Sequence, residues 1–173
     1  MDMKKLFLVF LLMCISVLPC SASNTMSAAD AAKVEQSDDV VITSDARHFN
    51  PLTGVYDLNG HVYVKFPVHG ESLQVQADTA QVKLYSQEVR AHGNITLQFG
   101  TMLFRCKETY VPIKERLANV QGNIFFKHEY TEIKADSAVY NWKTKIATFR
   151  NASYNGRSKK SVLTYDVMKK KLV

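Results

Sequence analysis

The chain has 173 residues, of which 46% are hydrophobic and 22% are charged, and its formal net charge is +6. That length suffices for one domain with a sizeable core, and the composition excludes a chain that is disordered throughout. The positive charge favours an anionic partner, such as nucleic acid or an anionic lipid, without choosing between them.

The N-terminus has the three parts of a secretory signal. Lys4 and Lys5 precede an apolar run at residues 6–18, and small residues follow up to Ala22. The run is shorter than the roughly 20 apolar residues that a membrane-spanning helix needs. We therefore predict a cleavable signal peptide at residues 1–22 and export to the periplasm. Export excludes most nucleic-acid partners, so we expect none.

Two alternatives to cleavage after Ala22 stay open. The apolar run could be retained as a membrane anchor, or Cys20 could be lipidated, although Pro19 stands where lipoprotein signals usually carry a small residue. Residues 23–38 are small and polar with little periodicity, which predicts a flexible leader. Cleavage would leave Cys106 as the single cysteine of the mature chain, so we expect no internal disulfide.

A unit of about thirty residues repeats four times along the chain. Each copy opens with a marker residue, which is Asp in three copies and Lys in one, and carries Gly or Asn fifteen positions later. Gly and Asn both tolerate a left-handed backbone, which suits a bend or a bulge. Such repeats indicate stacked supersecondary units. The marker pairs are Asp45 with Gly60, Asp78 with Gly93, Lys107 with Gly122, and Asp136 with Asn151.

Apolar and polar residues alternate within each copy. "LQVQA" and "ITLQF" have period two, the pattern of a strand with one face in solvent. "FNPLTG" and "YNWKTK" place an aromatic residue, Asn and Thr at matching offsets, which predicts equivalent tight turns. We therefore predict about three short strands per unit. The fold class is all-β, with residues 39–156 forming an open β-jellyroll or solenoid-like sandwich of stacked antiparallel strands.

The repeated pattern is I-x-x-D-x-A-x-x-Y/F followed by G-N/H-V/I. It is carried by Ile42, Asp45, Phe49, Thr53, Gly54, Gly60, Val62, Val75, Ala77, Asp78, Ala80, Gly93, Asn94, Ile95, Gly122, Asn123, Ile124, Ile133, Ala135, Asp136, Ala138, Tyr140 and Thr144. With this pattern, residues 39–155 resemble the OstA-like periplasmic domain of the lipopolysaccharide-transport bridge, the LptA family. The third copy departs from it, with Lys107 in place of Asp and Pro112 in the middle.

No residue pattern points to catalysis. The marker carboxylates occupy equivalent places in separate units, and we interpret each as ordering a turn through backbone amides. The histidines lack zinc-type spacing and are interpreted as surface residues, and Cys106 as a small buried apolar residue. A nucleophile elbow and a glycine-rich phosphate loop are both missing from the sequence. We expect no enzyme, no catalytic residue, no metal and no cofactor.

The apolar stripe of the repeats has two interpretations. It could be a filled core, or it could line an open groove in which each buried methylene of an acyl chain gains about 0.8 kcal/mol. Periodicity alone does not separate the two. The resemblance implies the second, because in that family the interior of the jellyroll carries lipid A chains. The predicted lining residues are Val40, Ile42, Val75, Phe104, Ile95, Leu97, Ile124, Phe126 and Ile133.

An open stack of strands leaves unpaired backbone groups at both ends. We expect one edge at residues 39–45 and the other at residues 146–155, with head-to-tail addition of further copies. The resemblance implies an LptC-like inner-membrane partner at the N-terminal edge and an LptD-like outer-membrane partner at the C-terminal edge.

Residues 157–173 are basic and are predicted to form a solvated tail, or alternatively to contact phosphate on lipid headgroups.

These observations predict a periplasmic carrier that binds lipopolysaccharide and bridges the two membranes. Two alternatives stay open. One is an LptC-like, membrane-anchored member of the same transport system. The other is a structural β-repeat module whose interior is fully packed and binds no lipid.

Overall fold

The computed structural model describes residues 35–36, 40–68 and 70–173. The described residues all lie in one compact unit, Ala31–Val173. The predicted signal peptide and most of the predicted leader therefore lie outside the described residues.

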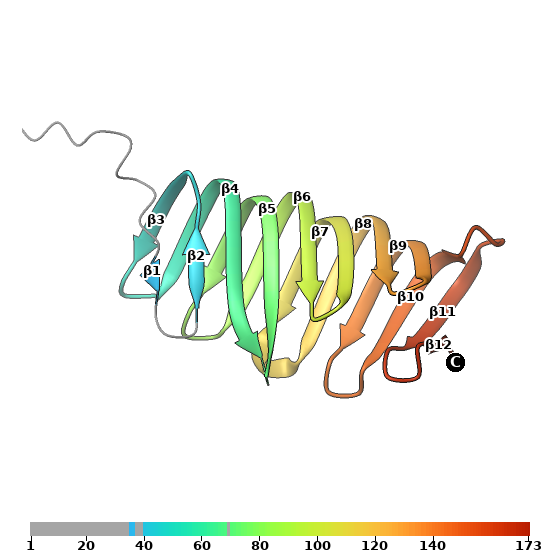
Figure 1. Ribbon diagram of the computed structural model, residues 1–173. Helices are drawn as coiled ribbons and strands as arrows, with labels where there is room; N and C mark the ends of the chain where they lie inside the picture. Colours follow the sequence, from blue (N-terminus) through green and yellow to red (C-terminus); the bar gives the residue numbers. More distant parts are fainter. Residues whose placement is uncertain (1–34, 37–39, 69) are drawn as a thin grey trace, which may run out of the picture. The chain divides into compact units, whose positions relative to one another are not determined.

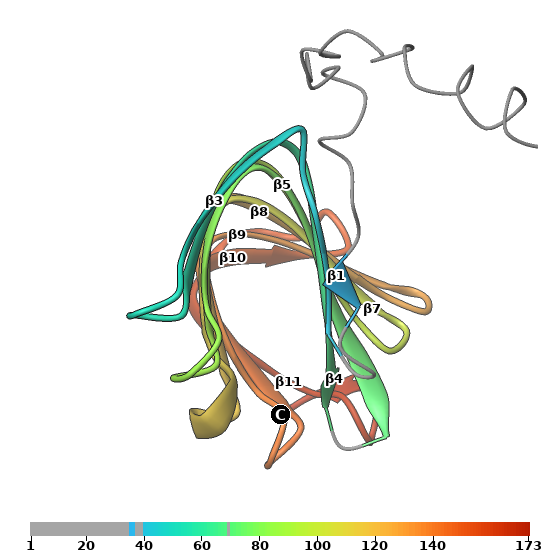
Figure 2. The same cartoon turned by 90° about the vertical axis from the view of Figure 1, so that its left-hand side faces the viewer.

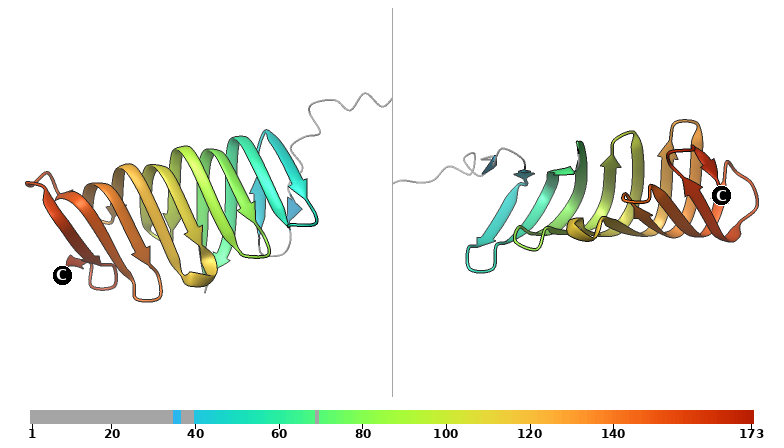
Figure 3. Two further views of the ribbon diagram at one scale, coloured as in Figure 1. Left: turned by 180° about the vertical axis from the view of Figure 1, so that it is seen from behind. Right: turned by 90° about the horizontal axis from the view of Figure 1, so that it is seen from below.

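In the described residues, twelve strands form one antiparallel sheet in which nearly every strand pairs with its neighbours along the chain, the exception being β2 and β3, which both pair with β4 (Figure 1). The sheet order is β1-β2-β4-β5-β6-β7-β8-β9-β10-β11-β12, and β3 pairs with β4 beside this path. Figure 3 shows the same succession from behind and from below. The strands are β1 Glu35–Gln36, β2 Val41–Thr43, β3 Ala46–Asn50, β4 Val55–Val68, β5 Glu71–Lys83, β6 Glu88–Phe99, β7 Met102–Pro112, β8 Leu117–His128, β9 Thr131–Asn141, β10 Ile146–Tyr154, β11 Lys160–Asp166 and β12 Lys171–Leu172, and a 3-10 turn η2 spans Ile113–Glu115.

The predicted all-β class and open antiparallel jellyroll are confirmed. The strands are longer than expected, because β4 to β9 each run for 11 to 14 residues through the marker positions instead of ending there. A bulge interrupts only part of the ladder, so hydrogen bonding resumes on its far side and the strand continues.

The marker pairs form these bulges. The register of β4 against β5 shifts between Asn59 and Val62, and Gly60 and His61 between them have φ angles of 73° and 43°. Equivalent shifts interrupt the next four strand pairs. An extra residue in a left-handed conformation bends the strand that carries it. Figure 2 shows the result, with the long strands bending over midway along their length.

The bulges divide the sheet into two halves that face each other. The first half-sheet consists of β3 and the strand segments next to the turns at residues 51–54, 84–87, 113–116 and 142–145. The second half-sheet consists of β2, the end of β4 and start of β5, and the strand segments next to the turns at residues 100–101 and 129–130. Alternate residues of both halves are buried in a single apolar core between them.

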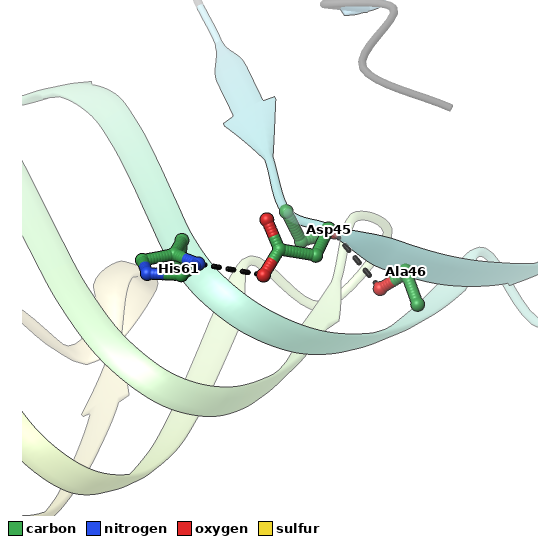
Figure 4. A network of polar contacts seen from close by, with 4 residues as sticks. Asp45, Ala46 and His61 are labelled. Carbon is green, nitrogen blue, oxygen red and sulfur yellow. Dashed lines mark hydrogen bonds and ion pairs between the residues drawn. The ribbon is translucent and has the colours of Figure 1, made fainter. Parts of the chain in front are cut away.

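The marker side chains support the bulge from outside the core. His61 Nδ1 lies 2.6 Å from Asp45 Oδ2 (Figure 4), Asn94 donates to Asp78 at 2.8 Å, and Asn151 donates to Asp136 at 3.1 Å. The expectation that these carboxylates bind backbone amides is therefore wrong, because each contacts a side chain instead. The partner is the residue after the glycine in the first two copies, and Asn151, which stands at the glycine position itself, in the fourth.

The two predicted turns are equivalent, as expected from their sequences. Asn50 Oδ1 accepts hydrogen bonds from the backbone amides of Leu52 and Thr53. Asn141 Oδ1 accepts from the amides of Lys143 and Thr144 in the same way. Both are Asx turns, which is the reason Asn occurs at this offset in both copies.

The predicted boundary at residue 156 is not a boundary of the sheet. Residues 160–166 form β11, which pairs with β10 and buries Leu163 and Tyr165, and β12 follows. The expected tail is thus structural over these strands, because its apolar residues cover the end of the core. Likewise, β10 is not the C-terminal edge of the sheet, because β11 and β12 follow it. At the other end, Glu35–Gln36 of the predicted leader form β1, which pairs with β2.

Candidate functional site

The predicted lining residues lie together in the core. Eight of the nine have exposed fractions of 0 to 3%, and the ninth, Val40, is half-buried against them. They come from successive strands of the second half-sheet and form one wall of the interior. The eight are Ile42 on β2, Val75 on β5, Ile95 and Leu97 on β6, Phe104 on β7, Ile124 and Phe126 on β8, and Ile133 on β9.

The opposite wall was missed by the sequence prediction. It is formed by buried residues of the first half-sheet, among them Tyr56, Val82, Val111, Tyr140 and Phe149. A signal for it exists, since Val82, Val111 and Tyr140 each stand four positions after a marker residue. The equivalent residue of the first copy, Phe49 on β3, is 38% exposed and stacks on Tyr56 at a ring distance of 4.3 Å.

Aromatic rings join the two walls toward the C-terminal end of the sheet. The ring of Phe126 lies 4.8 Å from Phe104 on its own wall and 5.1 Å from Phe149 on the opposite wall. Phe104 also reaches Phe149 at 6.3 Å and Tyr140 at 6.4 Å. This aromatic cluster fills the interior between β7 and β10 with side chains, so an acyl chain can enter here only if the half-sheets separate.

A buried histidine fastens β11 to the second half-sheet. His128 at the end of β8 lies 3.0 Å through Nδ1 from the Tyr165 hydroxyl, and 3.1 Å through Nε2 from the Thr101 hydroxyl. Burial lowers the pKa of His128, although the nearby Glu129 carboxylate acts in the other direction. The expectation that the histidines lie on the surface is therefore wrong for His128, which is 4% exposed.

The described residues contain no group of three or more His, Cys, Asp or Glu side chains that could hold a metal. Cys106 is buried, as predicted, and burial raises the pKa of its thiol to about 12. Hollows on the outside of the sheet follow the bulges, and their linings are mixed: one is formed by Asn94, Arg105, Lys107 and Asn123 among others.

Among the described residues, no helix has the length and apolar character required to cross a bilayer. The predicted anchor alternative concerns residues 6–18, which lie outside that part of the chain.

The comparisons with known proteins bear on the fold. No protein-family model matches the chain, and no curated protein matches its sequence. A solved structure does match: LptH of Pseudomonas aeruginosa, described as the LptA homologous periplasmic component of the conserved lipopolysaccharide transport device. The match has a TM-score of 0.53 and 12% sequence identity, and it covers 59% of this chain and 75% of LptH. The protein therefore has an LptA-like β-jellyroll fold.

Proposed function

We propose that this protein is a periplasmic carrier of lipopolysaccharide that shields the acyl chains between its two half-sheets. The observation that carries the proposal is the continuous apolar core between two half-sheets whose backbones, in the described residues, are joined only along the bulges. The half-sheets can separate along the turns without breaking a strand ladder, because no strand pairing links their free margins in the described residues. The LptA-like fold supports the same reading.

In this account the protein performs no chemistry. Acyl chains enter between the wall that includes Phe104 and the wall that includes Phe149, while the sugars and phosphates stay outside this acyl-chain space. Each methylene group that is buried between the half-sheets stabilises the bound lipid by about 0.8 kcal/mol. Energy for directional transfer comes from an inner-membrane partner.

The sheet edges would pass the lipid on. At the N-terminal end the five residues of β3 are all exposed, Phe49 least clearly at 38%, and among the described residues β3 pairs only with β4. We propose this edge, together with β1 and β2, for an LptC-like inner-membrane partner. At the other end β11 and β12, not β10, would meet an LptD-like outer-membrane partner or the β3 edge of a further copy.

A second candidate function rests on the filled aromatic cluster. Fully buried Phe104, Phe126 and Phe149 are what a permanently closed structural module would also show. Binding separates the two candidates, and the chain carries its own probe, since Trp142 is its single tryptophan and lies buried against Phe99.

The test titrates lipopolysaccharide into the mature chain while the emission of Trp142 is recorded. We expect a saturable change in emission, because separation of the half-sheets moves Phe99 away from Trp142. Binding detected by neither fluorescence nor calorimetry, in a chain that circular dichroism shows to be folded, would leave the structural module as the better account.

A further inference from the structure

The margin of the interior, opposite the bulges, is closed at one place by aromatic rings. Phe99, at the end of β6 on the second half-sheet, stacks on Trp142 at 5.6 Å and meets the edge of Tyr140 at 5.8 Å. Tyr140 is the last residue but one of β9 on the first half-sheet, and Trp142 opens the turn after that strand. We call these three residues the aromatic clasp. It adjoins the proposed acyl-chain space, since Tyr140 also contacts Phe104.

The clasp contains two polar atoms that its closed form leaves without partners. Three buried side-chain polar atoms in the described part of the chain lack a hydrogen bond, and two of them are the Tyr140 hydroxyl and the Trp142 Nε1. Their side chains are 1% and 4% exposed. Buried polar groups are nearly always paired, so two orphans in neighbouring rings call for an explanation. Burial, and then the Glu71 carboxylate, raise the pKa of Tyr140, which keeps its hydroxyl protonated as a donor.

The surroundings of the clasp offer both signs of charge. Lys145, in the turn after Trp142, places Nζ 5.3 Å from the centre of the Phe99 ring. Glu71 opens β5 on the second half-sheet, across the margin from Lys145. Its carboxylate lies beside Gly100, 3.3 Å from the position that a Cβ atom would take there. The site thus combines flat aromatic faces, an indole N–H that only donates, a phenol that donates and accepts, one carboxylate acceptor, and the Lys145 ammonium, which only donates.

We propose that the aromatic clasp, once Phe99 swings away, binds the hydroxyl groups of a saccharide headgroup. Sugar hydroxyls both donate and accept, so they match this mixed set of partners better than a phosphate, which only accepts and would face Glu71. The ligand would satisfy Tyr140 and Trp142 while its chains lie against Phe104. This inference rests on the proposed function, because it places the headgroup of the same amphiphile.

The test compares two amphiphiles with one chain length, dodecyl maltoside and dodecylphosphocholine, each below its micelle concentration. The altered protein carries Tyr140→Phe and Trp142→Phe, which remove the polar atoms and keep aromatic rings. Tyr63→Phe is the matched control, since its hydroxyl is on the outside of the second half-sheet, 3.4 Å from Gln74. We expect the wild type and the control to bind the maltoside about tenfold more tightly than the phosphocholine, and the double variant to lose that preference alone.

Two results would overturn the inference and leave the proposed function intact: equal or stronger binding of the phosphocholine by the wild type, or a preference that survives in the double variant while lipopolysaccharide still binds. Failure of all three ligands to bind would instead contradict the proposed function.

A second readout needs no ligand. Tyr140→Phe removes an unpaired group, so its melting temperature should equal or exceed that of the wild type, whereas Tyr165→Phe, which loses a bond to His128, should melt lower. A lower melting temperature for Tyr140→Phe would show that the hydroxyl is already paired and would contradict the inference.

Discussion

Gly93 packs directly against Asp78, and a Cβ atom placed on Gly93 would collide with the carboxylate of that aspartate. Gly60 and Asp45 repeat the relationship one unit earlier. In these two copies the spacing of marker and glycine therefore has a steric cause. The aspartate crosses the bulge to reach the residue after the glycine, and a side chain on the glycine would occupy the space that the carboxylate fills. The fourth copy differs, because Asn151 stands at the glycine position and itself donates to Asp136.

Gly93→Ala should destabilise the protein by about 2 to 4 kcal/mol, from strain at φ +74° and from the collision with Asp78. Gly156→Ala is the control, because Gly156 has a φ of +75° but nothing within 4 Å of the added atom. Urea unfolding of both variants, and of Gly93→Ala combined with Asp78→Ala, separates the two effects. Equal losses for Gly93→Ala and Gly156→Ala would show that the aspartate contact is unimportant.

Removal of residues 157–173 should cost about 3 to 6 kcal/mol, since Leu163 and Tyr165 are buried and cover Phe126 and Phe149. A shorter deletion of residues 167–173 removes β12 only and should cost much less. Thermal unfolding of the two truncated chains checks this. If the longer deletion leaves the melting temperature unchanged, residues 157–173 are the solvated tail that their charge predicts.

The stability of the protein should fall as the pH drops below about 6.5. Burial lowers the pKa of His128 in the folded state, so the unfolded chain binds more protons in the window between the two pKa values. The contribution of neutral His128 to the free energy of unfolding is therefore fully present above the pKa of the unfolded state. It is lost as the pH falls toward the lower pKa of the folded state. Glu129 and Lys170, which face His128, have opposing effects on it.

Urea unfolding of the wild type and His128→Gln at pH 7.5 and 5.5 measures this loss, and the variant should lose less. The contribution of His61 to this pH dependence has the opposite sign, because hydrogen bonding to Asp45 raises its pKa. His61→Gln should therefore steepen the loss of stability at low pH. A loss that is the same in wild type and His128→Gln would assign the pH dependence to other groups.

Cys106 should not react with a thiol reagent at pH 8 in the folded protein, and it should not link two chains. Burial holds the pKa of its thiol at about 12, and the thiolate is the reactive form. A thiol reagent whose product absorbs light reports the rate at which Cys106 reacts, and this rate is measured with and without urea. Reaction at equal rates in both conditions would mean that β7 opens freely at this position.

The bulges and turns were predictable because their causes are local. Asn50 and Asn141 accept from amides two and three residues on. The marker residue is followed fifteen positions later by Gly in three copies and by Asn in the fourth. β11 was not predicted, since "KSVLTYD" stands among lysines and follows the last repeat. The aromatic clasp was not predictable either. Phe99 and Trp142 meet across the two half-sheets from hairpins that are not adjacent, and this offset depends on the twist of the whole sheet.

The most direct test of acyl-chain binding between the half-sheets places a photoreactive phenylalanine, benzoylphenylalanine, at position 104 and, in a second protein, at position 105. Phe104 is fully buried in the interior and Arg105 is exposed on the outer face of the same strand. After circular dichroism shows that both proteins are folded, each is irradiated with lipopolysaccharide. We predict a lipopolysaccharide adduct at position 104 and little or none at 105. An adduct at 105 alone, or at neither position, would contradict an interior that carries lipid.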